Sequence, residues 1–162
     1  MPVQRFSHFG ICVADPERSI RFYRDLLGFR PLSSMEVSDP ASAQLVELER
    51  LRLHAYFLER DGVRIELLHY ESPGHEAAPV PRPMNRLGLT HMALRVEGLA
   101  EMLETLERAG VEILKRTRIS NPQLGSEVVY VLDPDGVRVE LIELPGDPDE
   151  PLGTAFSGNS SH

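Results

Sequence analysis

The feature that most constrains this chain is an eight-residue stretch that occurs twice. The copies begin at Asp61 and Asp135, read DGVRIELL and DGVRVELI, and differ at two positions, where one aliphatic residue replaces another. In each copy an Asp-Gly turn leads into alternating aliphatic and non-aliphatic residues, with a glutamate in the middle. A repeat this close predicts two copies of one structural module, with Glu66 and Glu140 at corresponding positions.

The same order of predicted elements surrounds each copy. In the first half, Asp15-Pro16 is a helix-start signal and Gly28 a helix end, because Asp caps the first turn and Gly adopts the left-handed conformation beyond the last. The predicted strands of this half cover 5–13, 29–37, 52–59 and 63–70, and a second, short helix is predicted over 41–50. In the second half, strands are predicted over 89–96, 111–118, 127–132 and 137–144, and a helix over 98–109.

Both halves therefore predict the order strand, helix, strand, strand, strand. This pattern indicates an α+β fold of two βαβββ modules, in which a helix covers one face of each curved mixed sheet and the other face contributes to a cup-shaped metal or ligand site. The expected boundaries are a first module over 1–71, a Pro-rich linker over 72–87, a second module over 88–144 and a mobile tail over 145–162.

Four side chains at matching positions of the two halves predict a metal site. Strand alternation places Glu66 and Glu140 on the faces opposite the aliphatic residues, and His8 and His91 lie on the matching first strands. Two neutral imidazoles and two carboxylates balance a divalent cation and leave two octahedral positions open for water or substrate. The sequence thus predicts a divalent metal held by His8, Glu66, His91 and Glu140; an exposed strand face is the alternative for the glutamates.

Other histidines lack this pairing, and the bulk properties exclude several classes of partner. His54 and His69 have no counterpart in the other half, so we expect surface or packing roles. The net charge of −8 argues against nucleic acid or an anionic membrane as partner. A single cysteine, Cys12, excludes an intramolecular disulfide. The N-terminus lacks the basic and apolar regions of a signal peptide, so a cytoplasmic location is the expectation.

Several motifs, in order along the chain, resemble the vicinal oxygen chelate superfamily. This group includes glyoxalase I, methylmalonyl-CoA epimerase, extradiol dioxygenases and the fosfomycin and bleomycin resistance proteins. The resemblance covers roughly residues 5–144 and rests on HFGICV at 8–13, SIRFY at 19–23, LG at 27–28, DPDG at 133–136 and EL at 140–141. It implies the same four metal ligands, and a His/Glu/His/Glu set is similar to that of bacterial-type glyoxalase I.

The resemblance also implies a reaction. A glyoxalase I-like lyase or isomerase would act on a small α-oxygenated carbonyl compound, with one divalent ion (Ni, Zn, Co, Mn or Fe) as the Lewis acid that stabilises an enediolate. Glu140 or Glu66 would then be the catalytic general base. Glyoxalase-like relatives often dimerise, so a homodimer is expected, with the modules paired within one chain or exchanged between two.

Two other functions remain open at this stage. An iron-dependent extradiol dioxygenase would use a three-ligand His, His, Glu set, and the additional carboxylate of Glu66 counts against it. A resistance-type protein would bind a hydrophobic small molecule without metal, and the paired histidines and glutamates count against that function. The 39–51 segment also departs from the short bacterial glyoxalases.

Overall fold

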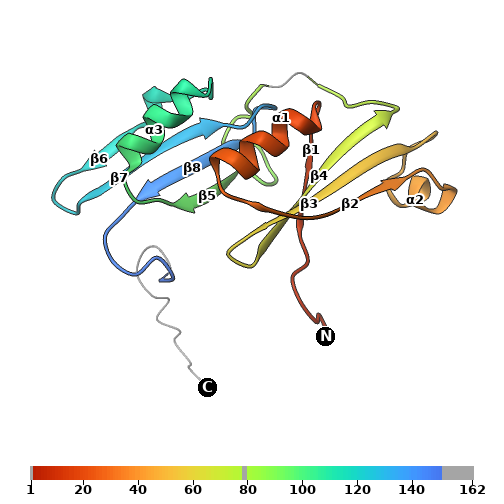
Figure 1. The fold of residues 1–162 in the computed structure, drawn as a ribbon, viewed down its shortest axis with the longest axis horizontal. Helices are drawn as coiled ribbons and strands as arrows, with labels where there is room; N and C mark the ends of the chain where they lie inside the picture. The colour runs from red at the N-terminus through yellow and green to blue at the C-terminus, as the bar shows by residue number, and fades with distance from the viewer. Residues whose placement is uncertain (1, 78–79, 151–162) are drawn as a thin grey trace. The chain divides into compact units, whose positions relative to one another are not determined.

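The computed structural model describes residues 2–77 and 80–150, which form two four-stranded sheets (Figure 1). The first sheet has the order β1-β4-β3-β2 and contains β1 (Phe9–Cys12), β2 (Arg30–Val37), β3 (Arg52–Arg60) and β4 (Val63–Ser72). The second has the order β5-β8-β7-β6 and contains β5 (His91–Arg95), β6 (Ile119–Asn121), β7 (Ser126–Leu132) and β8 (Arg138–Glu143). The identical order in the two sheets confirms the predicted pair of βαβββ modules.

Contacts within the chain define two compact units. The first contains Met1–Thr90 together with Leu132–Arg138, and the second contains His91–Val131 and Val139–His162. The turn between β7 and β8 thus groups with the first unit, although the two strands belong to the second sheet. Much of the tail predicted over 145–162 falls on residues 151–162, which lie outside the described residues.

The first helix begins and ends where the sequence predicts. The carboxylate of Asp15 accepts a hydrogen bond from the Arg18 backbone N–H at 3.1 Å and caps α1 (Pro16–Ile20). The helix continues as a π-helical segment, η1 (Arg21–Leu26), before Gly28. Asp39 caps α2 (Pro40–Leu45) in the same way, through the backbone N–H of Ser42, and so confirms the short second helix.

Strand alternation sorts the first sheet into a buried and a more open face. In β4, Ile65 and Leu67 are fully buried, whereas Glu66 between them is only partly buried. Helix α1 packs against β4, and β1 pairs with β4 in parallel. The buried apolar residues of this unit are Val13, Phe22, Tyr23, Leu27, Phe29, Leu51, Leu53, Ala55, Leu58, Ile65, Leu67 and Leu132.

The second unit repeats this arrangement with α3 (Leu99–Arg108). The apolar stripe of the helix is buried, as are the aliphatic positions of β7 and β8, which indicates that α3 covers the sheet. The buried apolar residues are Leu99, Leu103, Leu106, Leu114, Val129, Val131, Val139 and Leu141.

The prediction of a strand over 111–118 was wrong. Only Ile113 forms a bridge, to Val131, and the chain then closes a 3-10 turn, η2 (Lys115–Thr117), before β6. The cause is local, because the Thr117 hydroxyl donates to the Leu114 carbonyl at 2.8 Å and the Thr117 backbone N–H donates to the same carbonyl. These bonds compete with strand pairing, as threonine side chains often do.

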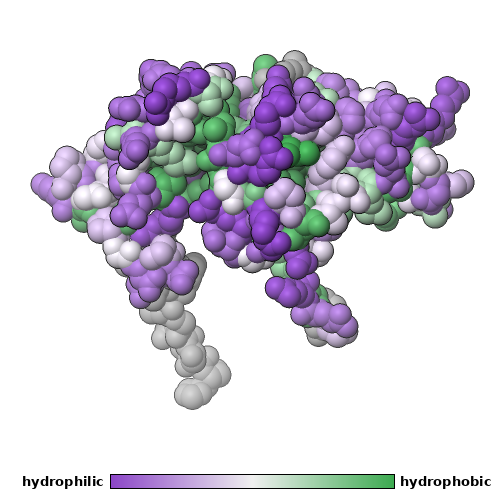
Figure 2. All heavy atoms as spheres, in the orientation of Figure 1, coloured by the Kyte–Doolittle hydropathy of each residue, from purple (hydrophilic) through white to green (hydrophobic). Residues whose placement is uncertain are grey.

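The outer side of α1 is polar. Hydrophilic side chains cover it in Figure 2. Exposed residues of α1 and η1 are Glu17, Arg21, Arg24 and Asp25. Such a surface opposite the buried Phe22 and Tyr23 makes the helix amphipathic. Among residues 2–77 and 80–150, no helix is both long and apolar enough to cross a membrane.

A buried hydrogen bond ties the β7–β8 turn to the first helix. The Tyr23 hydroxyl, on a side chain without exposed surface, donates to Asp133 Oδ2 at 2.8 Å. The other oxygen of Asp133 accepts the backbone N–H groups of Asp135 and Val137, at 2.9 and 2.7 Å. Both oxygens of the Asp133 carboxylate thus accept hydrogen bonds, which offsets the cost of burying it.

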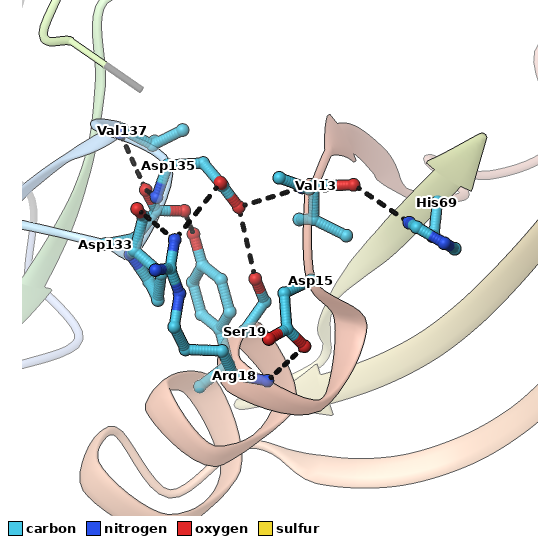
Figure 3. Close-up of polar contacts among 11 residues, drawn as sticks. Val13, Asp15, Arg18, Ser19, His69, Asp133, Asp135 and Val137 are labelled. Carbon is cyan, nitrogen blue, oxygen red and sulfur yellow. Dashed lines mark hydrogen bonds and ion pairs between the residues drawn. The ribbon is translucent and has the colours of Figure 1, made fainter. Parts of the chain in front are cut away.

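Asp135 makes a second set of contacts with the same helix (Figure 3). Its Oδ2 accepts bonds from the Ser19 hydroxyl and the Ala14 backbone N–H, both at 3.3 Å. Arg18 lies 3.5 Å from Asp135 Oδ1 and donates to the Pro134 carbonyl at 2.7 Å. The charged group of Arg18 compensates Oδ1, which is buried and accepts no hydrogen bond.

The corresponding turn of the first copy makes none of these contacts. The Asp61 side chain is 81% exposed and pairs with the neighbouring Arg60. A Cβ added to Gly62 would meet nothing within 4 Å, whereas one added to Gly136 would lie 2.9 Å from the Val80 carbonyl carbon. Nearly identical sequences therefore form one exposed turn and one packed turn.

Candidate metal centre

The first unit brings His8 and Glu66 together. Strand β1 runs parallel to β4 with Gly10 opposite Glu66, which places His8, one residue before β1, beside that glutamate. His8 Nε2 lies 3.1 Å from Glu66 Oε2, and the side chains are 35% and 17% exposed. The strand predicted over 5–13 is shorter than expected, but the predicted pairing of this histidine with this glutamate is present.

The second unit brings His91 and Glu140 together in the same way. His91 is the first residue of β5, Glu140 lies in β8, and these two strands are neighbours. His91 Nε2 lies 3.0 Å from Glu140 Oε2, and the side chains are 30% and 20% exposed. The two pairs therefore agree in residue type, in the atoms that meet and in distance.

An aromatic ring contacts the histidine of each pair, a feature that the sequence analysis missed. The Phe57 ring lies 5.4 Å from the His8 ring, and the Tyr130 ring 5.5 Å from the His91 ring, both between centroids and both at 81°. Phe57 is directly opposite Glu66 in the β3–β4 register. An aromatic residue in the strand before each Asp-Gly turn was the available signal.

The donor atoms fit two neighbouring ligands of one metal ion. Ligand atoms about 2.1 Å from a metal and at right angles to each other are separated by about 3.0 Å, and the two pairs measure 3.1 and 3.0 Å. Over its described residues, neither unit by itself gathers three His, Cys, Asp or Glu side chains for a metal. Each unit by itself offers one imidazole and one carboxylate.

One weakly acidic group, the Tyr70 hydroxyl, interacts with Glu66. Burial raises the pKa of the Tyr70 hydroxyl, and the charges of Cys12 and Glu66 raise it further. Burial also raises the pKa of the Cys12 thiol, with a further contribution from Asp135. The Tyr70 hydroxyl therefore keeps its proton at neutral pH and can donate a hydrogen bond to a ligand beside Glu66.

The other strand histidines have different partners. His54 Nε2 lies 3.3 Å from Glu71, and His54 Nδ1 lies 3.5 Å from Glu36. His69 Nδ1 lies 3.4 Å from the Val13 carbonyl oxygen, as Figure 3 shows. Neither histidine joins the two His–Glu pairs, in agreement with the surface or packing roles expected for them.

Comparison with known proteins gives relatives over most of the chain. The lactoylglutathione lyase of Salmonella typhimurium is 31% identical over 141 residues, which cover 86% of this chain and 92% of the relative. That of Escherichia coli O157:H7 is 30% identical over the same shares of both chains. A glyoxalase family protein from Bacillus cereus has a similar fold, with a TM-score of 0.78, 20% identity and coverage of 90% of this chain and 97% of that one.

The family model described as Glyoxalase/Bleomycin resistance protein/Dioxygenase superfamily matches residues 5–141. This match contains both His–Glu pairs and all of the strands except Ile142 and Glu143 at the end of β8. Together with the repeated βαβββ order and the relatives, it shows that the chain belongs to the glyoxalase/bleomycin resistance protein/dioxygenase superfamily.

Proposed function

We propose that this protein is a metal-dependent, glyoxalase I-like lyase or isomerase that moves a proton between adjacent carbons of a small α-oxygenated carbonyl compound. One divalent cation would be held by His8, Glu66, His91 and Glu140. When bound, the cation would supply Lewis-acid polarisation of the substrate oxygens. The repeated His–Glu pair, 3.1 Å in one unit and 3.0 Å in the other, is the observation that carries the proposal.

The carboxylates would perform the proton transfer. The Glu66 and Glu140 side chains are 17% and 20% exposed, so both are shielded while still reachable by a substrate. One of them would take a proton from the carbon that carries the hydroxyl group and return it to the former carbonyl carbon. The hydroxyl proton would pass to the former carbonyl oxygen, so the composition of the substrate is unchanged. His8 Nε2 and His91 Nε2 lie 3.1 and 3.0 Å from these carboxylates, so the imidazoles would bind the same ion as the carboxylates.

The relatives suggest the first substrate to test. They are named lactoylglutathione lyases, and the compound isomeric with lactoylglutathione is the hemithioacetal of glutathione and methylglyoxal. That compound is an α-oxygenated carbonyl with a proton on the carbon to be changed. Hydroxyacetone, which carries the same hydroxycarbonyl unit without the thiol, extends the test to smaller substrates.

The experiment measures metal content and turnover of the purified chain. Protein freed of metal is supplied with Ni²⁺, Co²⁺, Zn²⁺ or Mn²⁺, and hydrogen exchange at the reacting carbon is followed by NMR in D₂O. We expect exchange with at least one metal, and a loss of about 10²–10⁴-fold in Glu66→Gln or Glu140→Gln. A chain that binds none of these metals, and gains no activity from them, contradicts the proposal.

The same preparation tests the dioxygenase alternative. Oxygen uptake with catechol in the presence of Fe²⁺, retained in Glu66→Ala, is the result expected for a three-ligand ring-cleaving enzyme. We expect no oxygen uptake, because Glu66 is paired with His8 in the same way that Glu140 is paired with His91.

A further inference from the structure

The histidine of the first pair has a hydrogen-bond partner at its other nitrogen. Ser7 Oγ lies 2.8 Å from His8 Nδ1, while His8 Nε2 faces Glu66. With the Phe57 ring at its edge, the imidazole is contacted on three sides. Its orientation is therefore set by these neighbours as well as by its own backbone.

The hydrogen-bond partner of His8 Nδ1 is a hydroxyl, whereas a carboxylate or a backbone carbonyl could also bond to this nitrogen. A hydroxyl both donates and accepts a hydrogen bond, whereas a carboxylate or a carbonyl only accepts. When Nε2 carries a proton and donates a hydrogen bond to Glu66, the Ser7 hydroxyl can donate a hydrogen bond to Nδ1. When Nε2 gives its lone pair to a metal, Nδ1 carries the proton and Ser7 Oγ accepts it.

We infer that Ser7 is a positioning residue, whose hydroxyl keeps His8 oriented both when the histidine is paired with Glu66 and when Nε2 binds a metal. The inference rests on the proposed metal site and adds to it a residue that does not touch the metal. The second repeat has a hydroxyl-bearing residue at the corresponding place, because Thr90 precedes His91 as Ser7 precedes His8.

The chain itself suggests the matched variants. Ser7→Thr introduces the residue type found at the corresponding position of the second repeat. Ser7→Val introduces a side chain with nearly the same shape as threonine but without the hydroxyl. The Zn²⁺ dissociation constant of the full chain is measured by competition with a chromophoric chelator. We expect Ser7→Thr to remain within about twofold of the wild type and Ser7→Val to bind about tenfold more weakly, the lower end of the usual effect because Ser7 is exposed and water replaces part of the bond.

A spectroscopic measurement separates positioning from a general loss of structure. In chains with ¹⁵N-labelled histidine, long-range ¹H–¹⁵N correlation distinguishes the protonated from the metal-bound ring nitrogen. We expect His8 of the Zn²⁺-loaded wild type and Ser7→Thr to carry its proton on Nδ1, with a mixed or broadened pattern in Ser7→Val. Metal bound through Nδ1 in the wild type overturns the inference.

The controls show which claim fails. If His8→Ala weakens Zn²⁺ binding but Ser7→Val binds as tightly as Ser7→Thr, Ser7 has no positioning role and the metal site stands. If His8→Ala leaves Zn²⁺ affinity unchanged, His8 is not a ligand, and the proposed function and this inference fail together.

Discussion

At the scale of single residues, the hydrogen bond between Tyr23 and Asp133 is a buried polar contact of the packed turn. Both groups are buried, and the bond joins residues 110 positions apart in the chain. Removal of a donor to a buried carboxylate costs more than removal of an exposed one, since water cannot replace it. The bond thus connects two side chains whose contact no local sequence pattern predicts.

Tyr23→Phe deletes only the hydroxyl and leaves the ring in the core. We expect a loss of about 1.5–3 kcal/mol in the free energy of unfolding, because Asp133 Oδ2 loses its donor. Urea denaturation of the full chain measures this value. Tyr56→Phe is the matched control, on a partly exposed strand residue, and should change stability by less than about 0.5 kcal/mol. Equal effects of the two substitutions would contradict the assignment.

The buried Asp133 also predicts a pH dependence. Burial raises the pKa of this carboxyl above its ordinary value of 3.8, although hydrogen bonds from Tyr23, Val137 and Asp135 oppose the rise. The folded state then binds the proton more tightly than the unfolded state. The favourable contribution of Asp133 is therefore complete below the unfolded pKa and is lost as pH rises through the folded pKa.

Asp133→Asn removes this titration and keeps the shape. We expect the stability of the wild type relative to Asp133→Asn to fall as pH rises from about 3 to about 7, measured by urea denaturation at each pH. A difference that is constant over this range, or that grows with pH, would show that burial does not control the pKa of this carboxyl.

At the scale of elements, the two Asp-Gly turns show what an almost exact repeat leaves undetermined. Gly62 and Gly136 both have positive φ, +77° and +88°, so both turns need a residue that tolerates the left-handed region. Only the turn at Gly136 packs against another segment, at Val80. The difference lies in the surroundings and not in the repeated residues.

The matched substitutions Gly62→Ala and Gly136→Ala measure that difference. At Gly62 only the backbone conformation resists a Cβ, and we expect a cost of about 1–2 kcal/mol. At Gly136 the Cβ also meets backbone atoms at 2.9 Å, which raises the expected cost to about 2–5 kcal/mol. Thermal or urea unfolding compares them, and a smaller loss at Gly136 than at Gly62 would be inconsistent with the packed turn.

Most elements were predictable because their signals are local. The caps at Asp15 and Asp39 and the alternation around Glu66 depend on neighbouring residues, and the structure has these elements within a few residues of the predicted bounds. The 111–118 segment was not predictable in this way, since its apolar residues suit a strand while Thr117 closes a turn. The contact of Tyr23 with Asp133 has no signal in either local sequence.

At the scale of the whole molecule, each His–Glu pair was predictable from the internal repeat. Strand alternation predicted the sheet face on which Glu66 lies, and the matching first strands identified His8 as its partner. One comparison between the two halves therefore predicted both pairs. The surroundings of the pairs were predictable only in part. An aromatic residue in the strand before each Asp-Gly turn was a signal for Phe57. The contact of Ser7 with His8 depends on rotamer, which no pattern in the sequence encodes.

The assembly of the chain is a separate prediction. A family of paired modules permits exchange between two chains, so we expect a homodimer, observed by sedimentation velocity at micromolar concentration. A single species of 18.2 kDa at that concentration would contradict the prediction. Metal-loaded and metal-free samples should be run together, because a site with ligands from two chains would make the dimer depend on the metal.

Anomalous diffraction from crystals grown with Ni²⁺ or Zn²⁺ tests whether His8, Glu66, His91 and Glu140 bind one metal ion. We expect one strong anomalous peak for each His/Glu/His/Glu set, about 2.0–2.2 Å from His8 Nε2, His91 Nε2 and oxygens of Glu66 and Glu140. The four ligands can come from one chain or from two. A peak elsewhere, or well-ordered His–Glu pairs at about 3 Å with no peak beside them in metal-saturated crystals, would contradict this expectation.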